Sequence, residues 1–233
     1  MLEAKALFKS YRISGKKGIN RLVRAVNGVD FALREGQCCA LVGESGSGKS
    51  TLSQMLMGLI PPTSGDVILD GESLFSMHGR KAKARFIKMQ MVLQDGKSAL
   101  DPRFSVYESI AEPIKNLMDV PKERERKMVE DLMQQMDLPL ELLSRRAHEL
   151  SGGQQKRVCI ARAISVSPKF LIFDEAVSGL DVIVRKSILE LLKQLQGKRG
   201  FGCLFITHDI DVALYIVILQ IINTPSILFI SDY

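Results

Sequence analysis

The feature that most constrains the fold of this 233-residue chain is the octapeptide at residues 43–50, GESGSGKS, which fits the pattern G-x-x-x-x-G-K-[ST]. Such a loop turns its amide N–H groups inward around phosphate, and the helix after it directs its positive dipole end at the phosphates. Lys49 adds a formal charge near the β- and γ-phosphate oxygens, and Ser50 offers a hydroxyl to Mg²⁺. A chance glycine-rich turn is the alternative, but the apolar run before the loop and the helix after it favour a nucleotide-binding P-loop. Its predicted nucleotide-binding residues are Gly43, Glu44, Ser45, Gly46, Ser47, Gly48, Lys49, Ser50 and Thr51.

Two carboxylates follow the apolar run at residues 170–173. In P-loop ATPases the first carboxylate at such a strand end holds Mg²⁺, directly or through water. We therefore assign Asp174 to Mg²⁺, together with Ser50. Glu175 is placed to orient or deprotonate the attacking water. The alternative is an ordinary strand followed by an acidic turn, which does not explain why the strand lies downstream of a P-loop.

A second glycine-bearing stretch, LSGGQ at residues 150–154, opens a helix with an apolar face. Ser151 is a good helix N-cap, and the two glycines leave amide groups bare at the helix start. Bare amides and a hydroxyl at a helix N-terminus favour anions. A plain capped helix is the alternative, although five fixed residues make a coincidental match rare. The predicted anion-binding residues are Ser151, Gly152, Gly153 and Gln154.

The P-loop, the LSGGQ stretch and the two carboxylates, in this order and with a helical stretch between, resemble the nucleotide-binding subunit of ABC transporters. The resemblance covers about residues 1–211, and the pentapeptide is its most specific part. It implies an ATPase that uses ATP and Mg²⁺. It also implies that residues 151–154 reach the γ-phosphate held by a second subunit, in a homodimer or a heterodimer with another ABC ATPase.

The resemblance assigns further residues one by one. Gln94 matches the glutamine that contacts Mg²⁺ and the attacking water, and it begins the segment that touches the membrane partner. Residues 178–181 resemble the loop that crosses the dimer interface. His208 matches the histidine that senses the γ-phosphate. Tyr11 resembles the aromatic residue that stacks on adenine, and a plain strand-end tyrosine is its alternative.

The expected fold is α/β: a P-loop NTPase core of ABC type with a mainly parallel sheet, an N-terminal antiparallel β portion and an inserted α-helical subdomain. Alternation of strands and helices predicts the parallel sheet. We expect the core in about residues 1–94 and 151–211, where residues 2–8 alternate as on an edge strand. Helical spacing without a strand signal places the helical subdomain at about 95–150.

The segment after Gln94, DGKSALDPR, is similar to that of importer subunits for oligopeptides, dipeptides and nickel. This resemblance implies two transmembrane permease subunits, an indirect extracytoplasmic binding protein and a peripheral position on the cytoplasmic face of the cell membrane. Peptide and nickel remain equally supported. The net charge of +6 is spread over short groups, so we expect no nucleic-acid partner. Four cysteines without a C-x-x-C pair indicate a reduced, cytoplasmic setting.

Residues 212–233 depart from the family pattern, because no charge occurs in them before Asp232. This apolar tail has three interpretations: a divergent buried strand or helix, a membrane contact of marginal length, or the product of a frame-altering or truncating event, which we take as the hypothesis. Two alternatives to a working transport ATPase also stay open. They are a degenerate cassette that binds nucleotide without productive transport, and a soluble ABC ATPase without a transport role.

Overall fold

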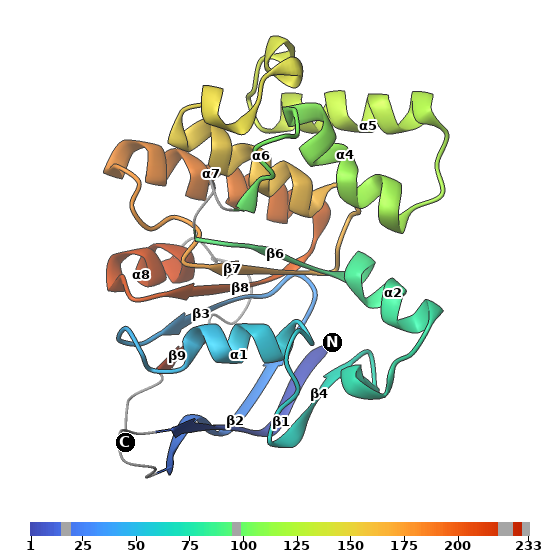
Figure 1. Cartoon of the computed structure of the whole chain (residues 1–233). Coiled ribbons are helices and arrows are strands. Elements are labelled where there is room, and N and C mark those ends of the chain that lie inside the picture. Colours follow the sequence, from blue (N-terminus) through green and yellow to red (C-terminus); the bar gives the residue numbers. More distant parts are fainter. Residues whose placement is uncertain (15–19, 95–98, 219–225, 230–233) are drawn as a thin grey trace.

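The computed structural model describes residues 1–14, 20–94, 99–218 and 226–229, which form two sheets and their covering helices (Figure 1). The first sheet has the order β2-β1-β4-β5, and its paired strands are antiparallel. Its strands are β1 (Leu2–Ser14), β2 (Asn20–Leu33), β4 (Ser64–Leu69) and β5 (Glu72–Ser73). The expected edge position of β1 is wrong, because β1 pairs with both β2 and β4. Alternation of apolar and polar residues shows only that one face of the strand is exposed to solvent. Inner and edge strands of an antiparallel sheet share this pattern, so it does not distinguish them.

The second sheet is parallel in every described pair and has the order β6-β7-β8-β3-β9. Its strands are β6 (Met89–Val92), β7 (Phe170–Asp174), β8 (Gly202–Thr207), β3 (Cys38–Val42) and β9 (Ser226–Phe229). Because all strands run one way, the residues that follow β3, β6, β7 and β8 emerge at one edge of the sheet. This edge gathers the predicted site residues.

Cys38 and Cys203 are joined by a disulfide near the opposite edge of the sheet. The expectation that all four cysteines are reduced is therefore wrong for this pair. The parallel register places Cys38 directly opposite Cys203, with 4.5 Å between their Cα atoms. Strand pairing of residues 165 positions apart is a long-range contact that cysteine spacing does not reveal.

Helices cover both faces of the parallel sheet (Figure 1). On one face lies α1 (Lys49–Leu56), with the antiparallel sheet beyond it; α2 (Arg80–Lys88) leads into β6. On the other face lie α6 (Gly152–Ile164) and α7 (Val182–Arg199). Side chains of β7 alternate between two cores: Phe170 and Ile172 pack with β1 and α1, and Leu171 and Phe173 pack toward α6 and α7.

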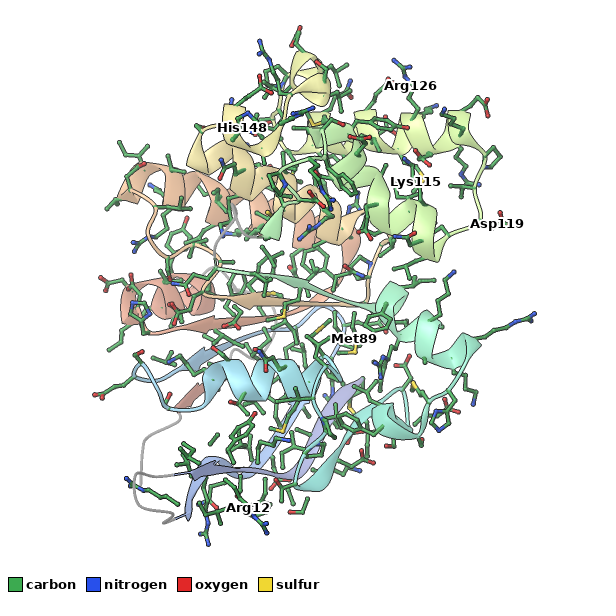
Figure 2. All side chains as sticks on the ribbon, viewed as in Figure 1. Arg12, Met89, Lys115, Asp119, Arg126 and His148 are labelled. Atoms are coloured by element: carbon green, nitrogen blue, oxygen red, sulfur yellow. A yellow bond between two sulfur atoms is a disulfide. The ribbon has the colours of Figure 1, made fainter. Side chains whose placement is uncertain are left out.

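The inserted subdomain is helical, as the sequence predicts. It contains α4 (Val106–Leu117), α5 (Lys122–Gln135) and the 3-10 turns η2 (Leu140–Ser144) and η3 (Ala147–Glu149); a further turn, η1 (Leu74–Ser76), precedes α2. Ser105 caps α4 in a reciprocal capping box with Glu108. Figure 2 shows Arg12 and Arg126 at opposite ends of the molecule, so these basic side chains belong to different surfaces.

The described part of the apolar tail belongs to the folded core. Helix α8 (Ile210–Ile218) packs Ala213 against Ala40 and Val42 of β3. Strand β9 pairs with β3 along the edge opposite to β8 and so extends the sheet by one strand. For α8, whose Val212, Ala213 and Ile216 are buried, this arrangement agrees with the interpretation of a divergent buried helix. No helix in the described ranges combines the length and apolar character that crossing a bilayer demands.

Candidate active site

The P-loop connects β3 to α1 and requires glycine at one position above all. Gly48 caps α1 with a φ of 89°, in the left-handed region. A Cβ atom at Gly48 would lie 1.8 Å from the backbone oxygen of Ala25 in β2. Gly46 has a similar φ of 92°, but nothing lies within 4 Å of its Cβ position. The close approach to β2, and not the backbone angle alone, therefore requires glycine at position 48.

The Lys49 side chain is buried inside this loop. Its Nζ atom donates to the backbone oxygens of Gly43 at 2.7 Å and Glu44 at 2.5 Å. Ser47, also buried, donates from Oγ to the Glu44 oxygen at 2.9 Å. These bonds curl the loop around a fixed positive charge, which is the arrangement that attracts phosphate oxygens. Thr51 is half-buried in the first turn of α1.

Asp174, at the end of β7, faces the first turns of α1. The Ser53 hydroxyl lies 3.0 Å from Asp174 Oδ2 and 2.9 Å from the Ser50 backbone oxygen. Burial raises the pKa of the Asp174 carboxyl; the charge of Glu175 also raises it, while the Ser53 hydrogen bond and the Lys49 charge lower it. A site that disfavours an ionised carboxylate gains from a cation beside it.

These residues fit the expected Mg²⁺ ion by their chemistry. Mg²⁺ is usually held by one or two carboxylates together with substrate phosphates. Asp174 supplies the carboxylate, and Ser50 supplies a hydroxyl at the start of α1. Three-residue clusters of histidine, cysteine, aspartate and glutamate suited to a metal ion do not occur among the described residues.

Glu175 and His208 are brought together at the same edge. Glu175 Oε1 lies 3.2 Å from His208 Nδ1, and the Glu175 side chain is 18% exposed against 55% for His208. The Glu175 amide donates to the Ile206 backbone oxygen at 2.9 Å, which ties the end of β7 to β8. Glu175 also adopts a φ of 47°, a left-handed conformation that is strained for a residue other than glycine. This conformation ends β7 at Asp174 and turns the chain away from the strand direction at Glu175.

Gln94 is exposed two residues after β6, and β6 pairs with β7. Gln94 thus emerges at the edge that carries Asp174. Residues 95–98 of the expected membrane-contacting segment lie outside the described residues. Tyr11 in β1 is 40% exposed and pairs with Val23 of β2, the strand whose Ala25 contacts the P-loop. The ammonium of Lys9 lies over the Tyr11 ring, 5.4 Å from its centroid, so stacking on adenine stays a prediction.

The predicted second anion site is an exposed helix tip. Ser151 Oγ accepts from the Gln154 amide at 3.3 Å, and Gln154 Oε1 accepts from the Ser151 amide at 2.9 Å. This reciprocal capping box holds the start of α6 rigid, with Ser151 and Gly152 exposed. Each of these side chains bonds to the backbone amide of the other residue, and no bond described for them reaches the P-loop of the same chain. The helix tip is therefore open to solvent.

Sequence reasoning missed two residues that contact the predicted site. Ser53 lies three positions after Ser50, and this helical spacing is the signal that could have found it. Lys156 in α6 donates from Nζ to the backbone oxygens of Leu93 and Gln94. No pattern marks it, because lysines are mostly exposed and these two acceptors are backbone atoms. In the loop that the resemblance assigns to the dimer interface, Asp181 caps α7 by accepting from the Val184 amide at 2.9 Å.

Comparison with known proteins decides the family. A family model described as ABC transporter matches residues 26–178. The chain belongs to the ABC transporter family. The nickel import ATP-binding protein NikE of Escherichia coli O157:H7 is 41% identical over 210 residues, which cover 90% of this chain and 78% of that protein. NikE of Escherichia coli K12 is 40% identical over the same shares.

Solved structures of other ABC cassettes share the fold. The dimeric bacterial ABC transporter cassette MJ0796 superposes with a TM-score of 0.84 at 28% identity, over 100% of this chain and 95% of that one. Its post-hydrolysis dimer bound to ADP and Pi gives 0.79 at 30% identity, over 91% and 90%. CbiO1 of Clostridium perfringens, part of the transporter complex cbiONQ, gives 0.78 at 31%, over 92% and 81%. This chain is an ABC ATPase with the P-loop NTPase fold.

Proposed function

We propose that this ABC ATPase energises a nickel importer. The support is its 40–41% identity, over 90% of its length, to proteins named as nickel import ATP-binding subunits. Sequence motifs alone left peptide and nickel equally supported, and the relatives favour nickel. The transported ion is cargo for the membrane subunits and does not bind at the ATPase site.

The observation that carries the ATPase mechanism is the convergence of Lys49, Asp174, Glu175 and His208 at one edge of the parallel sheet. Lys49 and the P-loop amides bind the phosphates, and Tyr11 stacks on the adenine. Asp174, Ser50 and Gln94 would hold Mg²⁺, which when bound neutralises charge on the phosphate oxygens.

The proton chemistry belongs to Glu175. Its carboxylate orients a water molecule for attack on the γ-phosphate and accepts the proton that this water loses. His208, 3.2 Å from Glu175 Oε1, fixes the carboxylate and contacts the γ-phosphate. The charge of Glu175 raises the pKa of the neighbouring Asp174 carboxyl, and a bound cation would offset this repulsion. Each step uses groups at the carboxyl ends of β3, β7 and β8.

Two cassettes complete the site. The outward tip of α6, with Ser151 and Gly152 exposed, contacts the γ-phosphate on the P-loop of a partner cassette. That partner is a second copy or a related ABC ATPase. Both work with two transmembrane permease subunits, reached through the segment after Gln94, at the cytoplasmic face of the cell membrane. The extracytoplasmic binding protein acts on the permeases and so only indirectly on this chain.

The test is the Glu175→Gln variant. It should lose steady-state ATPase at least 100-fold, because glutamine cannot accept the proton, and it should form a dimer with ATP and Mg²⁺ that size-exclusion chromatography resolves. Lys49→Ala is the matched control that should form no dimer. If E175Q stays monomeric alone and with its sister subunit, the two-cassette site is wrong.

The cargo needs a separate experiment. The chain is reconstituted in proteoliposomes with two permease subunits and a binding protein of a nickel importer. We expect Ni²⁺ to stimulate its ATPase activity and to enter the vesicles, whereas di- and oligopeptides do neither. Stimulation by peptides without Ni²⁺ uptake would transfer the proposal to the peptide branch.

A further inference from the structure

Lys156 is a buried cation that the mechanism above does not use. It lies in the second turn of α6 with 3% of its surface exposed. Its Nζ atom is 2.9 Å from the Leu93 oxygen and 2.6 Å from the Gln94 oxygen. Burying an ammonium costs several kcal/mol unless hydrogen bonds compensate. The bonds to Leu93 and Gln94 offset this cost and at the same time hold that stretch of backbone against α6. Lys49 uses the same chemistry to shape the P-loop.

The ammonium joins two parts of the site that come from different layers. Helix α6 begins at the Ser151 tip, one turn before Lys156. Leu93 and Gln94 directly follow β6, whose Val92 pairs with Phe173, the residue before Asp174. One side chain thus connects the helix offered to the partner's nucleotide with the strand end beside this chain's own metal-binding carboxylate.

A second bond from α6 reaches Ala99, the first described residue after Gln94. Arg162 Nη1 donates to the Ala99 oxygen at 2.5 Å. Arg162 lies six residues after Lys156, or about 9 Å along the helix axis. The two bonds therefore end on residues that precede and follow positions 95–98 in the sequence, and only the Lys156 bond lies at Gln94 itself. Arg162 provides a matched control with similar chemistry at another place.

We propose that Lys156 is a positioning residue for ATP hydrolysis. Through the backbone oxygens of Leu93 and Gln94 it fixes where the Gln94 side chain lies relative to the Ser151 tip. The inference rests on the roles assigned above to Gln94 and to residues 151–154. Its consequence is that a shift of α6 on meeting the partner's nucleotide carries Gln94 with it, so occupancy of one site sets the geometry of the other.

The test begins with Lys156→Met, which keeps the length of the apolar stem and removes the donor. We expect kcat to fall about tenfold and the half-saturating Mg²⁺ concentration to rise by a similar factor, as for outer-shell partners of metal sites. Nucleotide affinity measured in EDTA should stay within twofold, because the P-loop is untouched. Arg162→Met should leave kcat and the Mg²⁺ requirement within twofold of the wild type.

A double-mutant cycle shows whether Lys156 acts through Gln94. In a Gln94→Ala background, K156M should add less than twofold to the loss, because coupled residues are not additive. Lys156→Arg should restore part of the activity. A K156M effect that multiplies fully with Q94A, or one that R162M reproduces, overturns the proposal, as does wild-type kcat in K156M.

The remaining outcomes separate this inference from the proposed function. If Q94A alone keeps wild-type kcat, the role of Gln94 fails, and the inference fails with it while the E175Q dimer still stands. If E175Q forms no dimer, the two-cassette site fails whatever K156M does. Should K156M not fold, as judged by circular dichroism, the same losses are expected of Lys156→Gln, whose uncharged amide ends one bond short of the ammonium position. Wild-type kcat in K156Q would then overturn the proposal.

Discussion

Substituting alanine for Gly48 should damage the P-loop far more than the same change at Gly46. Both glycines have φ near 90°, so each alanine incurs a left-handed penalty of about 1–2 kcal/mol. At Gly48 the new Cβ also meets the Ala25 oxygen at 1.8 Å, where real Cβ contacts stay beyond 3.0 Å. The loop and β2 must therefore separate by about 1 Å. Overpacking of this kind typically adds about 1–3 kcal/mol, which gives about 2–5 kcal/mol for G48A against about 1–2 kcal/mol for G46A.

The assay is urea unfolding of the wild type and both variants without nucleotide, so that lost phosphate contacts do not enter the comparison. Equal m-values would show that the free energies of unfolding are comparable. ATP binding is then measured by equilibrium dialysis, and we expect G48A to lose it because the amides and Lys49 move together. If G48A is destabilised by no more than G46A, the contact between Gly48 and β2 does not constrain the loop, and the reasoning is refuted.

Three further predictions concern the helix tip, the metal-binding carboxylate and the tail. Ser151→Ala and Ser105→Ala should each lose about 1 kcal/mol of stability, since both serines cap helices in reciprocal boxes, but only S151A should lose ATPase activity. Asp174→Asn should abolish Mg²⁺-dependent ATPase yet raise the melting temperature. Because folding raises the Asp174 pKa, the wild type loses stability as the pH rises from 3.8 through the folded-state pKa. The difference in melting temperature between D174N and the wild type should therefore grow over that pH window. Ala213→Asp, with 1% of the residue exposed, should cost more than 3 kcal/mol in urea unfolding, whereas Leu214→Asp, 44% exposed, should cost less than 1 kcal/mol; equal effects would place α8 off the sheet.

Chain order and parallel topology made the catalytic edge predictable. Lys49, Asp174 and His208 each follow an apolar run of strand length, and parallel strands deliver such residues to one edge of a sheet. The pairing of Glu175 with His208 follows from the neighbouring positions of β7 and β8. The fold class and the helical insertion were predictable for the same reason, since periodicity changes where the layers change.

The unpredicted features all depend on contacts that period and spacing do not encode. The inner position of β1 needs knowledge of β4, which lies about 60 residues downstream. The two bonds described for Lys156 end on backbone oxygens, which carry no sequence signature. The disulfide of Cys38 depends on strand register between distant segments. Whether the Ser151 tip meets a phosphate stays a prediction, because its partner is another molecule.

The left-handed backbone of Glu175 has a consequence for engineering. At a φ of 47°, glycine would relieve roughly 1 kcal/mol that the folded chain now stores. Directed evolution of this protein for heat resistance alone should therefore enrich Glu175→Gly and yield variants that are more stable but have no ATPase activity. Any such selection needs an assay of ATP hydrolysis at every round, because stability favours glycine at position 175 and hydrolysis requires glutamate there.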